Sequence, residues 1–167
     1  EGFDLGNSPF GYMDGNVQGR DIAITTTNGT RAIRMSEAAE EVIVGAFLNL
    51  QAVANHLTDL GLDVLVVCAG WKGQFNLEDT LYAGALVERL QSAFSSEHDS
   101  SLAALYLYQT AKTDMVGFLR QSSHVRRLEH LEIHKDIEFC LRHDVYSVLP
   151  VWRHDRLVDL MKLKELE

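Results

Sequence analysis

Apolar residues form short continuous runs in the first half of the chain and recur at helical spacing in the second half. Residues 63–69 (DVLVVCA) carry no charge after the first position and are apolar on both alternating faces, which is typical of a strand covered on both sides. The β-branched run at 41–46 and the apolar run at 21–25 predict two earlier strands, and 145–151 predict a last one. We expect the strand at 63–69 to lie at the centre of a sheet.

Helical spacing fills the intervals between these runs and most of the second half. Asn49 can cap a helix that Gly61 ends, and Glu78 and Asp79 occupy the first turn of a longer one. The predicted helices cover 30–39, 50–60, 77–94, 101–112, 114–121, 123–131, 135–143 and 155–166. The alternation of strand, loop and helix predicts an α/β fold, with a layered sheet, crossover helices on both faces and a helix-rich second half.

Length and composition describe one ordinary globular domain over residues 1–167, with 46% apolar residues. A chain of this size buries about 70% of the surface that it exposes when unfolded, so a sizeable core is expected. No low-complexity linker divides it. The chain opens on a glycine-rich loop without an initiator Met, and we therefore expect an N-terminally truncated domain.

Charge and cysteine content narrow the partners and the compartment. Fifteen basic and 24 acidic side chains give a net charge of −9 without a basic stripe, which disfavours nucleic acid and acidic membranes as partners. The sequence has no run of 18 apolar residues and no signal-peptide pattern, and its two separated cysteines make no disulfide framework. We expect a cytoplasmic protein, and the sequence leaves its assembly open, a homo-oligomer included.

Residues 25–31 (TTTNGTR) follow the first predicted strand and lead into a helix. Their four hydroxyls, the amides of a turn and the N–H groups of a first helical turn can converge on a few oxygens, and Arg31 supplies full positive charge. Phosphate is the anion that such donors favour. For this string alone, the alternative is a strand end followed by a hydroxyl-capped helix that binds nothing.

A second loop, residues 70–76 (GWKGQFN), follows the predicted strand at 63–69. Loops that follow parallel strands gather at the carboxyl edge of the sheet, so we expect this loop and 25–31 to face one crevice. Glycine in each loop permits close approach of the backbone to a ligand. Lys72 and the carboxylates of Glu78 and Asp79 add charge to the second loop.

Glu78 and Asp79 are candidate Mg²⁺ ligands, since Mg²⁺ commonly takes one or two carboxylates and keeps several waters. The structural alternative is that both carboxylates oppose the helix dipole, a contribution of about 0.3–1 kcal/mol each. Asp4 and Asp136 are further oxygen donors.

Cys68 is a candidate nucleophile if a helix N-terminus lowers the pKa of its thiol, and a small buried apolar side chain is the alternative. His130 and His134 have a spacing that suits zinc, but their polar surroundings favour a solvated helix face. Arg126 and Arg127 follow two serines at a predicted helix start and could clamp a carboxylate or sulfonate. A capped helix with exposed basic residues accounts equally well for that pair.

Several uncommon strings occur in a fixed order: GFDLGNSP, TTTNGTRA, GAFLN, VCAG and LEDTLYAGAL, followed by a Ser-x-His…Leu…Asp-Ile…Cys…Pro spacing. In this respect the chain resembles the 2-phosphosulfolactate phosphatase family from Gly2 to Pro150. The resemblance implies a Mg²⁺-dependent acid phosphatase that hydrolyses 2-phospho-3-sulfolactate to 3-sulfolactate and phosphate, a step linked to coenzyme M biosynthesis. Family members also carry an upstream motif of the Asp-Val-Leu-Arg-Ala-Thr-Thr-Thr type. We therefore expect the chain as given to lack an acidic residue and an arginine of the site. A chain that lacks them could be inactive.

The resemblance also carries functional positions onto this chain. Among the matching positions, we predict catalytic roles for Asp4 and Cys68 and metal binding by Glu78 and Asp79. The matching positions that we predict to bind a small phosphorylated substrate are Asn7, Ser8, Thr26, Thr27, Asn28, Gly29, Thr30, Arg31 and Gly70. The nucleophile stays open among Asp4, Cys68, a metal-activated water and an upstream acid. Two other functions stay open as well: an anion-binding relative without turnover, and a phosphatase for another 2-phosphorylated hydroxy acid.

Overall fold

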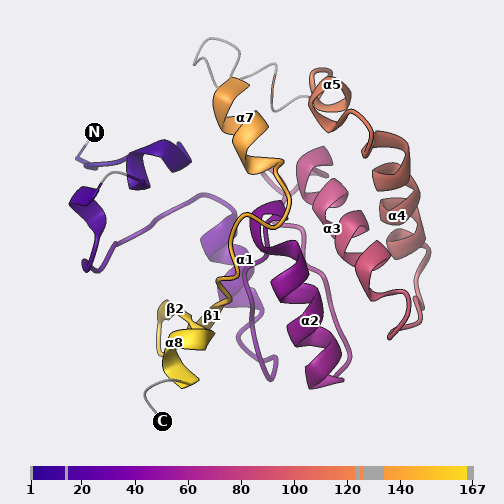
Figure 1. Cartoon of the computed structure of the whole chain (residues 1–167), viewed down its shortest axis with the longest axis horizontal. Helices are drawn as coiled ribbons and strands as arrows, with labels where there is room; N and C mark the ends of the chain where they lie inside the picture. The colour runs from indigo at the N-terminus through magenta and orange to yellow at the C-terminus, as the bar shows by residue number, and fades with distance from the viewer. Residues whose placement is uncertain (1, 14, 123–124, 126–133, 165–167) are drawn as a thin grey trace.

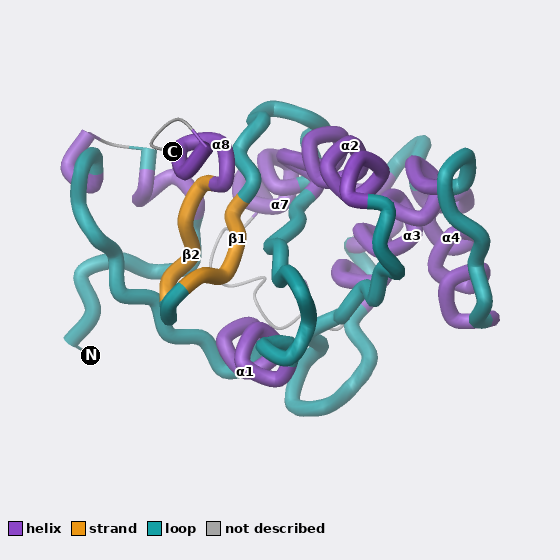
Figure 2. The backbone as a smooth tube through the Cα atoms, turned by 90° about the horizontal axis from the view of Figure 1, so that it is seen from below, coloured by secondary structure: helices purple, strands orange, loops and turns teal. Residues whose placement is uncertain are grey.

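The computed structural model describes residues 2–13, 15–122, 125 and 134–164 of the chain. It combines helices with one small sheet, which agrees with the predicted α/β class. Helices α2 (Leu50–Leu60), α3 (Leu77–Leu90) and α4 (Asp99–Ala111) lie on one side of the molecule, and a hairpin with α8 lies on the other (Figures 1 and 2). The shorter helical elements are η1 (Pro9–Tyr12), η2 (Gly15–Val17), α1 (Gly29–Met35), η3 (Phe47–Asn49), α5 (Met115–Leu119), α7 (His134–Cys140) and α8 (Leu160–Lys164).

Strand β1 (Pro150–Arg153) pairs antiparallel with β2 (Arg156–Asp159), and Arg153 faces Arg156 at the closed end. His154 and Asp155 make the turn with φ values of 49° and 63°, both left-handed, which is the geometry of a two-residue hairpin. The prediction of a strand at 145–151 followed by a helix at 155–166 was therefore wrong in its boundaries. The turn reverses the chain at 154–155, and the helix begins only after the second strand.

The predicted strands at 21–25 and 63–69 are not strands within the described part of the chain, and 41–46 contributes only an isolated bridge between Ile43 and Val151. Residues 63–69 make no backbone hydrogen bond among the described residues. Val66 packs against the core, whereas Leu65 is 86% exposed. An apolar run indicates which side chains of a segment are buried, but a strand also requires a neighbouring segment that hydrogen-bonds to its backbone.

Most predicted helices form, with shifted ends. The predicted helix at 30–39 ends at Met35, and the one at 77–94 ends at Leu90. Helices α4, α5 and α7 replace the predictions at 101–112, 114–121 and 135–143, and the prediction at 123–131 lies almost wholly outside the described residues. No helix in the described ranges has the length and apolar character needed to cross a bilayer.

The core is built where α2, α3 and α4 pack together and β1 closes over them. Leu50, Leu81 and Val151 are completely buried. Gly84 allows α3 to approach α4 closely, because a Cβ at this position would collide with the Ala104 carbonyl oxygen. The helical packing thus fixes the N-terminal end of α3, which lines the site described below.

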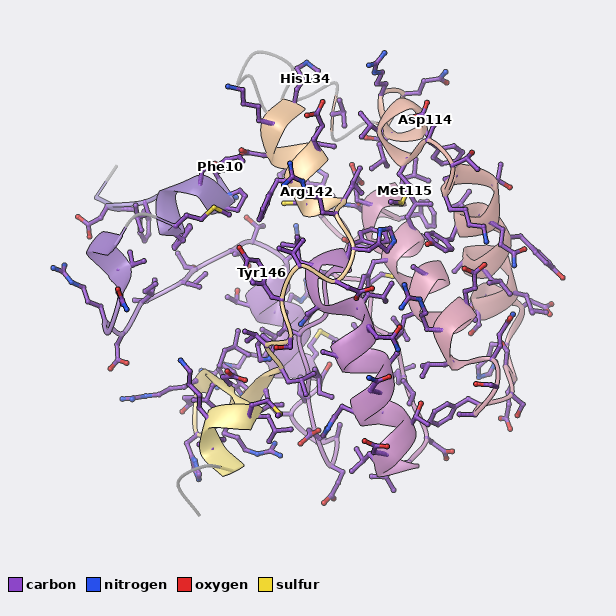
Figure 3. All side chains as sticks on the ribbon, in the orientation of Figure 1. Phe10, Asp114, Met115, His134, Arg142 and Tyr146 are labelled. Carbon is purple, nitrogen blue, oxygen red and sulfur yellow. The ribbon has the colours of Figure 1, made fainter. Side chains whose placement is uncertain are left out.

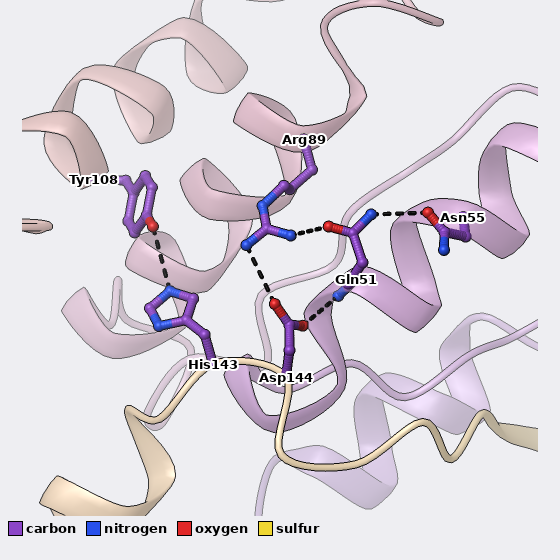
Figure 4. Close-up of polar contacts among 6 residues, drawn as sticks. All are labelled: Gln51, Asn55, Arg89, Tyr108, His143 and Asp144. Carbon is purple, nitrogen blue, oxygen red and sulfur yellow. Dashed lines mark hydrogen bonds and ion pairs between the residues drawn. The ribbon is translucent and has the colours of Figure 1, made fainter.

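A polar network joins these helices to the segment that follows α7 (Figure 4). The Asp144 carboxylate accepts the Gln51 N–H at 2.6 Å and contacts the Arg89 guanidinium at 3.3 Å. Arg89 also donates to the Gln51 side chain, and the Tyr108 hydroxyl contacts His143 Nε2 at 3.2 Å. The network joins α2, α3 and α4 to the segment that leads into β1.

Candidate active site

Two loops far apart in the sequence meet at an open cavity of about 560 Å³. Its lining comes from the N-terminal segment, from both glycine-containing loops and from the first turn of α3. The lining residues are Asn7, Thr25, Thr26, Thr27, Asn28, Gly29, Ala69, Gly70, Trp71, Asn76 and Asp79. The two loops therefore face one crevice, as the sequence predicts, although the parallel sheet from which that prediction came does not form within the described residues.

A direct hydrogen bond joins the loops: the Lys72 backbone N–H donates to the Asn28 side-chain oxygen at 3.3 Å. Asn28 is also the residue that precedes α1, so the same side chain links the start of this helix to the glycine loop. Without this contact, each of the two exposed loops would be ordered only by contacts within itself.

The threonine loop is ordered from within. The Thr30 N–H donates to Thr26 Oγ1 at 3.0 Å, and the Thr30 hydroxyl donates to the Thr26 carbonyl at 2.7 Å. Thr26 thus satisfies one of the open amides of α1, while the Gly29 amide has no acceptor among the described residues. Part of the predicted hydroxyl cradle caps the helix, and the remainder faces the cavity.

Gly70 takes a left-handed conformation with φ 67°, and a Cβ there would lie 2.5 Å from the Gln74 carbonyl oxygen. Trp71 and Gln74 exchange backbone hydrogen bonds of 3.0 and 2.9 Å across the tight turn. The Asp79 carboxylate accepts the Gly70 N–H at 2.7 Å, which ties the turn to α3. Its second oxygen makes no hydrogen bond within the described residues.

Glu78 and Asp79 have different surroundings although they are adjacent. Asn76 caps α3 by accepting the Glu78 N–H at 2.9 Å. The Glu78 carboxylate accepts the hydroxyl of buried Ser122 at 2.9 Å, and this hydroxyl accepts the Val125 N–H at 3.1 Å. Asp79 lines the cavity and Glu78 does not.

Cys68 lies immediately before the cavity lining. Burial of its thiol raises the pKa of Cys68, the nearby Asp79 carboxylate raises it further, and a hydrogen bond with Thr80 opposes both effects. Because the thiolate is the nucleophilic form, this environment disfavours the reactive form of Cys68.

Several other predicted positions lie outside the lining. Asp4, Thr30 and Arg31 are not among its residues, and Arg31 is exposed. The Ser8 hydroxyl donates to Asp136. His134 begins α7, whereas Arg126, Arg127 and His130 lie outside the described residues.

Four lining residues, Thr25, Ala69, Trp71 and Asn76, were not among the individually predicted site residues. Asn76 carried a usable signal, because an Asn directly before an acidic first helical turn is typical of an N-cap. An N-cap at the end of a glycine loop places its side chain beside whatever the loop encloses.

The oxygen donors of the cavity fit Mg²⁺, but the described residues would supply few of its ligands. Among the lining residues that the structure describes, Asp79 is the one carboxylate, and the lining also provides amide and hydroxyl oxygens. No group of three or more His, Cys, Asp or Glu side chains suited to a metal occurs in the ranges that the structure describes. A Mg²⁺ ion here would use Asp79, amide oxygens of the lining and several waters, which is within the range of known Mg²⁺ coordination.

Comparisons with known proteins agree with the resemblance. A family profile described as 2-phosphosulpholactate phosphatase matches residues 1–155. Curated relatives named probable 2-phosphosulfolactate phosphatase include one from Caldanaerobacter subterraneus subsp. tengcongensis, 43% identical over 151 residues that cover 90% of this chain and 63% of the relative. The relative from a Synechococcus species is 44% identical over 153 residues, with 89% and 63% covered. The relative from Clostridium acetobutylicum is 34% identical over 160 residues, with 95% and 68% covered.

The match spans 63–68% of the length of these three relatives. It includes both loops of the cavity and the first turn of α3. The chain belongs to the 2-phosphosulfolactate phosphatase family.

Proposed function

We propose that this protein provides the phosphate-binding cavity of a phosphatase that hydrolyses 2-phospho-3-sulfolactate to 3-sulfolactate and phosphate. The observation that carries the proposal is the cavity itself, in which the threonine loop, the glycine turn and Asp79 meet. The names of the curated relatives support the same activity.

The phosphoryl group binds where the N-terminal ends of α1 and α3 border the cavity. Asn28 and Gly29 come from the start of α1, and Asn76 and Asp79 from the start of α3. The positive ends of helix dipoles, the open Gly29 amide, threonine hydroxyls and asparagine amides are the donors that an anion requires. These local donors outweigh the net charge of −9, because screening limits the distant charges to about 8 Å at physiological salt.

Asp79 is the better candidate of the two predicted Mg²⁺ ligands. Each of the two carboxylates accepts one hydrogen bond among the described residues, Asp79 from the Gly70 N–H and Glu78 from the Ser122 hydroxyl. Asp79 lines the cavity, whereas Glu78 does not. When bound, Mg²⁺ would neutralise charge on the phosphoryl oxygens. In this proposal Glu78 positions the segment after α5 and binds no metal.

Attack on phosphorus is assigned to water. Asp4 lies outside the lining, and the raised pKa of Cys68 disfavours the nucleophilic thiolate. Water forms the new P–O bond as the bond to the sulfolactate oxygen breaks. Of the two protons of this water, one ends on the departing oxygen and the other stays on the released hydrogen phosphate. The asparagine and threonine side chains hold the phosphoryl group in line for this displacement.

Phosphate release tests the proposal. The chain is incubated with 2-phospho-3-sulfolactate in Mg²⁺ and then in EDTA, beside the matched substrate in which a carboxylate replaces the sulfonate. Release in Mg²⁺, its loss in EDTA and preference for the sulfonate support the proposal. Preference for the carboxylate supports a phosphatase for another 2-phosphorylated hydroxy acid.

An anion-binding protein without turnover is the second candidate, and one observation favours it. The described residues provide one lining carboxylate and no acidic cluster for a metal. Binding of inorganic phosphate without release from the substrate supports this candidate and contradicts the first.

A further inference from the structure

The N-terminal segment is attached to α7, although the two are separated by more than 120 residues (Figure 1). The Ser8 hydroxyl donates to Asp136 Oδ1 at 3.0 Å. Phe10, on η1 of this segment, lies beside α7 (Figure 3), and its ring centroid is 5.4 Å from that of Phe139. Arg142 covers the Phe139 ring, with its guanidinium carbon 5.6 Å from the ring centroid.

The contact between Ser8 and Asp136 replaces a local one. Ser8 occupies the N-cap position of η1 in an extended conformation, with φ −63° and ψ 128°, yet its side chain makes no capping hydrogen bond. A serine at this position ordinarily caps the helix that it precedes. Here its hydroxyl donates instead to a carboxylate 128 positions along the chain.

Asn7 directly precedes Ser8 and lines the cavity, so the contact of Ser8 with Asp136 affects the position of Asn7. Most of the segment is exposed and rich in glycine. Within it, the Tyr12 hydroxyl donates to the Gly6 carbonyl at 2.9 Å, so Asn7 lies between this local contact and the contact of Ser8 with Asp136. Asp136 does not line the cavity, and no other hydrogen bond or ion pair of its carboxylate occurs among the described residues.

We infer that Asp136 is a positioning residue for anion binding: by holding the Ser8 hydroxyl, it places the Asn7 amide at the cavity. The inference rests on the proposed function of that cavity. Asp136 acts through Ser8 and touches no ligand, so only its ability to accept a hydrogen bond matters. An uncharged acceptor of the same shape therefore serves equally well.

The test measures the dissociation constant of inorganic phosphate for the 167-residue chain and five variants. Ser8→Ala and Asp136→Ala should each raise the constant about three- to tenfold, the loss expected for one hydrogen bond. The double variant should be no worse than either single one, because both remove the same contact. Asp136→Asn, which keeps an oxygen acceptor, should stay within about twofold of the parent. Glu138→Ala, an exposed acid on the same helix, is the control and should change nothing.

Additive losses in the double variant, an unaffected Asp136→Ala, or an Asp136→Asn as damaging as Asp136→Ala would each overturn the inference. Amide exchange of residues 7–12 provides a reading that needs no ligand. Exchange should accelerate in Ser8→Ala and Asp136→Ala and not in Glu138→Ala. If the parent chain binds no phosphate, the proposed function fails, and equal exchange in all variants separately contradicts the contact itself.

Discussion

The Lys72 backbone N–H donates to the side-chain oxygen of Asn28, at 3.3 Å and across 44 positions of sequence. This bond joins the threonine loop to the glycine turn at the rim of the cavity. Neither loop is covered by a continuous sheet in the described structure, so the cavity depends on contacts of this kind.

Replacing Asn28 with alanine should therefore weaken phosphate binding about three- to tenfold, the loss expected for one such hydrogen bond. Calorimetric titration with inorganic phosphate measures the change. Asn55→Ala, which removes an amide from α2 away from this cavity, is the matched control. Equal affinities of the parent and Asn28→Ala would show that the loops meet without this bond.

Gly70→Ala should lower the free energy of unfolding by about 1–3 kcal/mol, because a side chain would add left-handed strain and overlap with the Gln74 carbonyl. Urea unfolding measures the loss. Gly73→Ala is a close control, since Gly73 also has a positive φ, 74°, but has open space for a Cβ. A loss at Gly73 as large as that at Gly70 would assign the effect to backbone strain alone.

The reactivity of Cys68 should respond in opposite directions to its two neighbours. Asp79→Asn removes a carboxylate that raises the pKa of Cys68, so the pKa should fall and alkylation by iodoacetamide at a fixed pH should become faster. Thr80→Val removes a hydrogen bond that lowers the same pKa, so alkylation should become slower. The pH dependence of alkylation, measured with Cys140→Ser in all proteins, separates the two. Changes of the same sign in both variants would contradict the arrangement.

His143 should make the chain less stable in mild acid. Burial lowers the pKa of His143 below 6.5, Arg89 lowers it further, and Asp144 opposes them. The unfolded chain therefore binds more protons as the pH falls through about 6.5, and the free energy of unfolding decreases there. Urea unfolding between pH 5 and 7.5 should show a smaller pH dependence for His143→Gln than for the parent. His98→Gln, at an exposed position, should keep the parental slope.

The meeting of the two loops was predictable, because each pairs glycine with polar side chains after an apolar run. The pairing of the apolar runs was not. Residues 63–69 have the composition of a central strand, but the sequence does not state which segment would bond to them, and no described residue does. The hairpin at 150–159 escaped prediction because His154 and Asp155 are uncommon residues for a turn in which both have positive φ.

The distribution of site residues was predictable only where local rules decide it. Their positions in the first helical turn indicate that Glu78 and Asp79 point in different directions. They do not indicate that Glu78 accepts the Ser122 hydroxyl or that Asp79 accepts the Gly70 N–H. The contact of Glu78 with Ser122 links segments 44 positions apart, and the bond between Ser8 and Asp136 links segments 128 positions apart. Helical periodicity and capping preferences describe neighbours along the chain and contain no information about such partners.

The extended segment at 63–69 continues directly into the lining at Ala69 and Gly70. Leu65 and Val67 face solvent on this segment, and no hydrogen-bonded neighbour in the described ranges restrains its backbone. Only Cys68 and Ala69 separate the exposed Val67 side chain from Gly70, the residue whose N–H the Asp79 carboxylate accepts. The solvent-facing apolar side chains of this segment therefore lie within a few residues of the ligand cavity along the chain.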